Sequence, residues 1–128
     1  MRFVALLLGL MFISPFTVAN EETSAEAIYL PLTPQFTVNL LGDNHYLRTS
    51  IQLQLRNDEI KESIEAHNPA IRHALIVLLS NNYVENISSG SDKIELQNRA
   101  VQVLNTTLKK CAKKEGVEAV FFTEFVSQ

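Results

Sequence analysis

The chain has 128 residues, a length that supports one domain. Its composition, 46% hydrophobic and 20% charged with few glycines and prolines, is ordinary for a globular protein. The formal net charge of −3 supplies no basic surface, which excludes the electrostatic footprint of a nucleic-acid-binding protein.

The N-terminus has the layout of an export segment. Arg2 supplies a positive charge, residues 3–19 carry none, and acidic residues follow. We expect residues 1–19 to be either a signal peptide, cleaved after Ala19, or an N-terminal membrane anchor. The apolar stretch is near the lower limit of the roughly 17 to 25 residues that span a bilayer, and Pro15 interrupts it, which favours cleavage. In both cases the remaining domain should lie outside the cytoplasm, because the positive charge stays inside.

A linker and a strand hairpin are predicted next. Residues 20–31 form the expected linker, and the two prolines within residues 29–34 impose an extended path that excludes helix. Residues 36–40 and 46–56 alternate apolar and polar side chains, as strands with one buried face do. Turn residues at positions 42–44 separate them, so the two strands should form an antiparallel hairpin.

Three helices should follow the hairpin, over residues 58–66, 69–79 and about 92–112, because apolar residues there recur at three- and four-residue steps. Ile76 and Val77 widen the apolar stripe of the second helix, so that helix should be the most buried. Residues 83–87 fit either a helical turn or a short extended piece. Asn57, Asn68 and Ser91 are expected to cap the starts of the three helices. Gly116 is expected to end the last helix.

The segment 117–128 is predicted to be a strand that is apolar on both faces. Regular alternation would divide its side chains into one set, Ala119, Phe121, Thr123 and Phe125, and a second set, Val120, Phe122, Glu124 and Val126. Helices should cover one face, and the linker or another molecule the other. The strand should join the hairpin, in the middle of the sheet or beside the first strand.

This order of elements predicts an α+β domain, in which three helices pack on one side of a small antiparallel sheet made of the hairpin and the C-terminal strand. The open edges of such a sheet can recruit other chains.

No residue pattern points to catalysis, a cofactor or a metal. The few glycines are not clustered, and His67 and His73 lack the spacing of zinc ligands. Cys111 is the only cysteine, and it is either a small buried side chain or a thiol free to pair between molecules. Asn86 and Asn105 each begin a match to the glycosylation acceptor pattern, which arises often by chance.

Two charged features have alternative interpretations. Lysines cluster at the end of the third helix, at positions 109, 110, 113 and 114. They are either a solvated helix end or a contact for acidic lipid or an acidic partner. Glu124 interrupts the apolar terminal strand, so its carboxylate should reach water or pair with Arg48 or Arg56 across the sheet, or else form a polar contact between subunits.

Four segments together resemble the FliL family of flagellar basal-body-associated proteins. Their shared order and spacing carry the resemblance, which covers residues 32–128: Leu32 to Leu40, Tyr46 to Leu53, Pro69 to Ser80, and Val120 to Gln128. The resemblance implies a periplasmic domain of the stomatin/prohibitin type at residues 32–128. It also implies a non-enzymatic protein that forms a homo-oligomeric ring around flagellar stator units at the inner membrane and supports rotation, swimming, swarming and chemotaxis.

The residues expected to serve interaction rather than catalysis are Arg72, Glu124, Phe125 and Gln128, with Phe36 as packing partner of the last strand. The alternative function is a soluble periplasmic ligand-binding or interaction module with no motor role, which an apolar pocket between sheet and helices would support.

Overall fold

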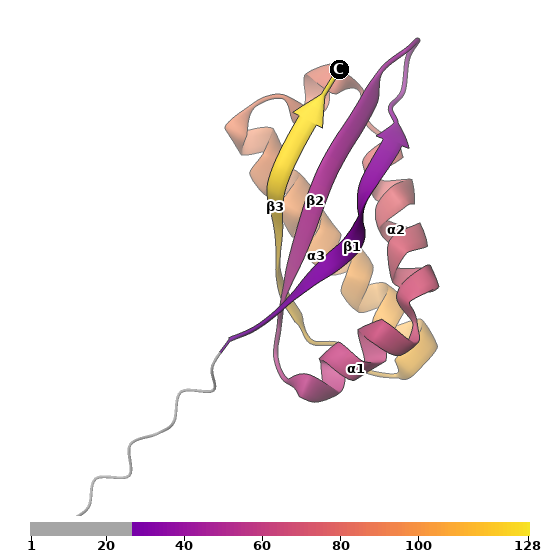
Figure 1. Ribbon diagram of the computed structural model, residues 1–128, viewed down its shortest axis with the longest axis vertical. Helices are drawn as coiled ribbons and strands as arrows, with labels where there is room; N and C mark the ends of the chain where they lie inside the picture. The colour runs from indigo at the N-terminus through magenta and orange to yellow at the C-terminus, as the bar shows by residue number, and fades with distance from the viewer. Residues whose placement is uncertain (1–26) are drawn as a thin grey trace, which may run out of the picture.

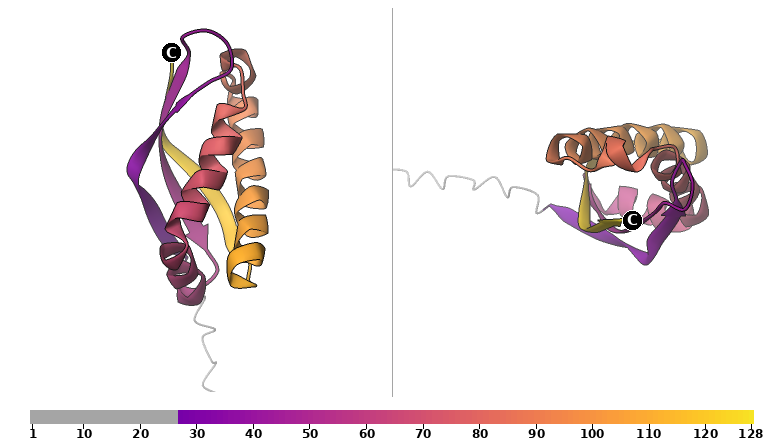
Figure 2. Two further views of the ribbon diagram at one scale, coloured as in Figure 1. Left: turned by 90° about the vertical axis from the view of Figure 1, so that its right-hand side faces the viewer. Right: turned by 90° about the horizontal axis from the view of Figure 1, so that it is seen from above.

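Strands and helices form two layers in the computed structural model, which describes residues 27–128 (Figure 1). The elements in chain order are β1 (Ile28–Asn39), β2 (Tyr46–Leu55), α1 (Asp58–Ala66), α2 (Asn68–Ser80), the 3₁₀ turn η1 (Val84–Ile87), α3 (Gly90–Ala112) and β3 (Val117–Ser127). One antiparallel three-stranded sheet lies on one side and the helices cover its other side (Figure 2). The predicted α+β class is confirmed. The expected signal peptide or anchor, residues 1–19, lies outside the described residues.

The strand order is β1-β2-β3, so the predicted position of the last strand is wrong. It pairs with β2 along its whole length instead of entering the middle or lying beside β1. The central strand is β2, whose inward side chains, from Leu47 to Leu55, are at most 2% exposed. Alternation reports which faces of a strand are buried and says nothing about its edges, which is why the sequence did not reveal that both edges of β2 are paired.

β1 is longer than the predicted strand and starts at Ile28, within the stretch expected to be a linker. Leu32 pairs with Ile51 and Phe36 pairs with Thr49, so three residues of β1, 33–35, lie opposite the single residue Ser50. A strand can continue past prolines in this way only at the edge of a sheet or at a bulge, because proline donates no backbone hydrogen bond.

β3 contains two bulges that correct the predicted division of its faces. Glu118 is an extra residue, because the consecutive β2 residues Leu55 and Gln54 pair with Val117 and Ala119. Thr123 is extra in the same way, because Ile51 and Ser50 pair with Phe122 and Glu124. Each inserted residue reverses the alternation beyond it. The helix side therefore carries Val117, Val120, Phe122 and Phe125, whereas Phe121 and Glu124 lie on the outer side. Within residues 27–128 the second face is left partly open, since Phe121 is 39% exposed, and its cover by another molecule stays a prediction.

The helix starts agree with the sequence in part. Asn57 caps α1 as predicted, with its side-chain oxygen accepting from the Ile60 backbone N–H at 3.0 Å. Asn68 is already the first residue of α2, and His67 stands at the cap position without a side-chain bond. α3 is capped by Ser89 instead of Ser91, in a capping box with Asp92 that satisfies two backbone N–H groups.

Gly116 does not end α3, contrary to the prediction. Lys113 occupies the left-handed position after the helix, with φ of 57°. Gly116 lies further along, packed against α1, and a Cβ atom there would stand 2.4 Å from Cγ1 of Ile60. The glycine is therefore required by the close approach of two segments rather than by a turn.

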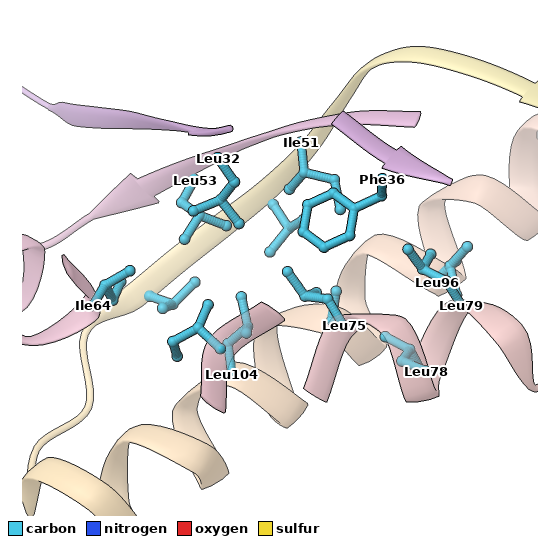
Figure 3. Close-up of a cluster of buried hydrophobic side chains, with 14 of the residues drawn as sticks. Leu32, Phe36, Ile51, Leu53, Ile64, Leu75, Leu78, Leu79, Leu96 and Leu104 are labelled. Atoms are coloured by element: carbon cyan, nitrogen blue, oxygen red, sulfur yellow. The ribbon is translucent and has the colours of Figure 1, made fainter. Parts of the chain in front are cut away.

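Buried aliphatic side chains fill the space between the layers. Figure 3 shows Leu32, Phe36, Ile51 and Leu53 extending from the sheet toward Leu75 and other helix residues. Thr49 and Asn82 are the buried polar residues in the described part of the chain. Asn82 closes the end of α2, since its Nδ2 donates to the carbonyls of Leu78 and Leu79 at 2.8 and 3.1 Å.

The start of β3 is fixed by Asn105 of α3. Its Oδ1 accepts from the backbone N–H groups of Gly116 and Val117 at 3.0 and 2.9 Å, and its Nδ2 donates to the Val117 carbonyl at 3.0 Å. The Asn105 side chain, which begins one of the matches to the glycosylation acceptor pattern, is thus part of the fold.

Within residues 27–128 there is no helix with the length and apolar character needed to cross a bilayer.

Candidate functional site

Two of the predicted interaction residues, Phe36 and Phe125, belong to one row that crosses the sheet. Thr49 of β2 lies between them, paired with Phe36 on one side and Phe125 on the other. Phe36 is 1% exposed and Thr49 is fully buried, so the row faces the helices. Phe36 is therefore a core residue, and its link to the last strand runs through Thr49 rather than by direct strand pairing.

Arg72 of α2 lies over this row. Its guanidinium carbon is 4.0 Å from the centroid of the Phe36 ring, a cation–π arrangement. Within residues 27–128, its buried Nη1 has no hydrogen-bond partner. A buried N–H without an acceptor is destabilising, so the stacking contact and the apolar stem hold this side chain in place.

Phe125 lies at the other end of the row beneath α3. The Phe122 ring is 5.3 Å away between centroids, and Nζ of Lys93 is 5.0 Å from the Phe125 centroid. Each end of the row is thus capped by a cation from a helix: Arg72 from α2 and Lys93 from α3.

Glu124 lies on the opposite face of the sheet, in a polar network that spans all three strands. Its carboxylate is 3.6 Å from the guanidinium of Arg48 and accepts from Nε2 of Gln35 at 2.9 Å. Gln35 also donates to Ser50 at 3.1 Å. The expected pairing across the sheet is therefore confirmed for Arg48, whereas Arg56 donates to the Glu115 carbonyl. The side chain of Glu124 is 50% exposed, and an ion pair in that setting is typically worth less than about 1 kcal/mol.

Gln128 extends the pairing of β3 with β2. Its backbone N–H donates to the Tyr46 carbonyl at 2.9 Å, and its carbonyl accepts from the Tyr46 N–H at 2.8 Å. The Tyr46 hydroxyl also donates to the side-chain oxygen of Gln128 at 2.6 Å. This residue holds the end of the strand in register.

The residues predicted for interaction do not form one surface. Phe36, Arg72 and Phe125 pack between sheet and helices, Glu124 lies on the outer face, and Gln128 lies at the end of the sheet. All of them except Arg72 share one half of the sheet, opposite residues 46–50 of β2, and Arg72 covers Phe36 from α2. The contacts described above lie within the domain, so most of these residues serve to hold the fold together.

Two of the four lysines in the cluster are paired inside the domain. Lys109 lies 3.1 Å from Glu115, and Lys114 binds Glu59 of α1. The hydrogen bond and the charge of Lys114 lower the pKa of Glu59 below its ordinary value. These contacts support the interpretation of a solvated helix end that ties α3 to its neighbours.

Two exposed apolar features were not foreseen. Tyr29 and Phe121, 50% and 39% exposed, lie on the outer sheet face with ring centroids 6.5 Å apart; we call them the aromatic pair. A groove of about 380 Å³, the α2–α3 groove, is lined by His73, Ala74, Val77, Leu78, Asn81, Arg99 and Val103.

Both features escaped the sequence reasoning for identifiable reasons. Tyr29 stood in the expected linker, where no strand pairing was assigned. The prediction that Ile76 and Val77 widen a buried stripe is wrong, since they are 40% and 52% exposed. The signal was present in the run from Ala74 to Leu79, because six consecutive apolar residues encircle a helix and cannot all face one core.

No arrangement of metal ligands was found in the part of the chain that the structure describes, where no three His, Cys, Asp or Glu side chains converge. Cys111 is half-buried near the end of α3.

Comparison with known proteins adds two findings. Residues 29–128, nearly all of the described domain, match the family model for "Flagellar basal body-associated protein FliL". The chain is also 32% identical over 103 residues to the flagellar protein FliL of Aquifex aeolicus (strain VF5), a match that covers 79% of this chain. The matched part of the chain spans 62% of the length of the Aquifex protein, less than two thirds.

Proposed function

The chain belongs to the FliL family of flagellar basal body-associated proteins, and from this premise we propose that it is a non-enzymatic accessory protein of the basal body that supports the stator units during flagellar rotation. The observation that carries the proposal is the extent of the family match, from residue 29 to residue 128, which takes in every strand and helix of the domain. Swimming, swarming and chemotactic movement would then depend on the protein.

In this proposal the domain at residues 32–128 works on the periplasmic side of the inner membrane. Residues 1–19 act as its anchor or are removed as a signal peptide, and residues 20–31 include the connection to the domain. N-terminal sequencing of the protein from fractionated cells separates the two cases. Asn20 as the first residue means cleavage, and Met1 in the membrane fraction means an anchor.

The proposed mode of action is assembly: copies of the domain form a ring around a stator unit. Two features support self-association. Among residues 27–128, no helix covers the outer face of the sheet (Figure 2), and apolar side chains are exposed on that face. A closed ring of identical copies requires that each copy present two different surfaces to its two neighbours.

Gene deletion with complementation tests the proposed function. Deleting the gene should reduce swimming or swarming, and the full chain should restore it and co-purify with basal bodies or stator units. Normal motility of the deletion strain together with absence from purified basal bodies would overturn the proposal.

The alternative, a soluble ligand-binding module, calls for an apolar cavity between sheet and helices. Buried side chains fill that space apart from a hollow of about 240 Å³ lined by residues 30–33 of β1 and by Ile64, Glu65 and Asn68. A larger and more apolar hollow lies along α2 and α3. A purified monomer that retains a small molecule would favour this alternative, whereas ring-sized particles would argue against it.

A further inference from the structure

The aromatic pair on the outer sheet face has the character of a binding anchor. Large aromatic side chains are the residues most enriched at the centres of protein interfaces. Phe121 comes from β3 and Tyr29 from β1, yet their rings meet across β2, where Tyr29 pairs with Gln54 and Phe121 pairs with Gln52, two residues away on the same face. Two edge strands thus hold the rings in place, while both remain substantially exposed.

The α2–α3 groove is an apolar recess on the other layer of the domain. Ala74, Val77 and Leu78 of α2 and Val103 of α3 line it. Leu78 belongs to the core and Val103 packs against it, so the groove runs along the rim of the core. Val77 is 52% exposed although it is apolar, so the groove leaves hydrophobic surface in water.

The charges beside these two surfaces are complementary. Arg99 lines the groove and forms no ion pair within residues 27–128. Glu118 lies next to Gln54, which pairs with Tyr29, and within residues 27–128 its carboxylate has only a long contact of 3.5 Å from Nε2 of Gln54. A contact that seats the aromatic pair in the groove would allow Glu118 to meet Arg99.

We propose that copies of this chain associate head to tail, with the aromatic pair of one copy seated in the α2–α3 groove of the next. The two surfaces lie on different layers of the domain, one on the outer face of the sheet and one on the helices. Figure 2 shows these two layers side by side. Such a contact is heterologous, and it generates a ring when the rotation between copies closes. The inference rests on the self-association in the proposed function, for which it names the two surfaces.

Two single variants, mixed, test this arrangement. Phe121→Glu disables the aromatic pair and leaves the groove intact, whereas Val77→Glu disables the groove and leaves the aromatic pair intact. Ile94→Glu is the matched control, because Ile94 is 60% exposed on α3 and belongs to neither surface. The full chain is purified in mild detergent, its fold is checked by circular dichroism, and its mass is measured by sedimentation.

The wild-type chain and Ile94→Glu should form particles larger than dimers. Each of the other variants alone should be monomeric, with self-association weakened about 30-fold or more, as for an interface hot spot. An equimolar mixture of Phe121→Glu and Val77→Glu should give dimers and nothing larger, because only one competent pair of surfaces remains. A charge exchange, Arg99→Glu with Glu118→Arg in one chain, should assemble better than either single change.

Other results overturn the inference. If Val77→Glu still dimerises alone, the aromatic pairs meet each other, and if Phe121→Glu does so, the grooves meet. A mixture that stays monomeric, or variants with wild-type mass, also rejects the contact. When the wild-type chain forms large particles that both variants retain, self-association stands and only these surfaces are wrong. A monomeric wild-type chain that still co-purifies with basal bodies rejects self-association but not the flagellar role.

Discussion

The side chain of Asn105 forms two hydrogen bonds with the backbone of Val117, accepting from its N–H at 2.9 Å and donating to its carbonyl at 3.0 Å. A helix side chain thus binds both backbone polar groups of the first residue of β3, which lies opposite Leu55 of β2. This contact ties the long helix α3 to the sheet at the point where the chain returns to it.

Replacing Asn105 with alanine should lower the free energy of unfolding by roughly 2–4 kcal/mol, because the partly buried backbone groups of Gly116 and Val117 lose their partners. Urea denaturation followed by circular dichroism measures this. Asn98→Ala is the control, since Asn98 lies exposed on the same helix and should change stability by less than about 0.5 kcal/mol. Equal losses in the two variants would contradict the role given to Asn105.

Gly116→Ala should destabilise the domain by about 1–3 kcal/mol, because the added methyl group would overlap Cγ1 of Ile60. Gly90→Ala is a matched control, since nothing lies within 4 Å of the Cβ position there and alanine favours helix. Thermal unfolding should show a lower melting temperature for the first variant and an unchanged or higher one for the second. Trimming Ile60 to alanine should lessen the effect of Gly116→Ala.

Arg72→Met should leave stability within about 1.5 kcal/mol of the wild type, because methionine keeps apolar cover over Phe36 and removes the buried Nη1 that has no acceptor within residues 27–128. Arg72→Ala should cost more, since it uncovers the ring. Denaturation of the two variants and the wild type, compared side by side, measures these changes in the free energy of unfolding. If methionine proves as damaging as alanine, the positive charge itself is required at this position.

The ion pair of Glu59 and Lys114 should give a small acid dependence to stability. Lys114 lowers the pKa of Glu59 below its ordinary value of 4.5, so the stabilisation is present above that value and is lost as pH falls through the lower pKa of the folded state. The stability difference between the wild type and Lys114→Ala should therefore shrink as the pH is lowered from 6 to 3. Lys110→Ala, which removes an exposed lysine of the same helix end, should show no such convergence.

Removing residues 125–128 should unfold or disassemble the domain. Phe125 packs against Phe122 and below Lys93, and Gln128 carries three hydrogen bonds to Tyr46. Replacing a buried Phe with alanine typically lowers the free energy of unfolding by about 3–5 kcal/mol. Phe125 is only partly buried, so the loss for Phe125→Ala should lie at or below the lower end of that range. Melting temperature and particle size report both effects. An unchanged value of both in the truncated chain would refute the role assigned to this segment.

Sequence periodicity located the hairpin, the three helices and the last strand, because the burial of one face repeats along each element. It did not locate features that depend on a second segment. The bulges at Glu118 and Thr123 are invisible to alternation, and they place Phe122 and Phe125 on the same, helix side, whereas regular alternation puts them on opposite faces. Gly116 was assigned to a helix end because its neighbour Ile60 lies on another element.

The candidate site follows the same division. The partner of Glu124 could be narrowed to two arginines from strand alternation, and Arg48 proved to be the one. The aromatic pair could not be foreseen, since it joins Tyr29 and Phe121 from strands that do not pair with each other.

The irregularities of the two outer strands also restrict how copies of this protein can meet. β1 carries two prolines and a three-residue bulge, and β3 carries two bulges, so neither presents a flat run of free backbone groups. A foreign strand therefore finds no regular template on either side of the sheet, and growth into a cross-β fibre is disfavoured. In the proposed assembly, contacts between copies would therefore be made by side chains on the two layers. Side chains specify a partner and a geometry, whereas backbone pairing would accept almost any extended chain.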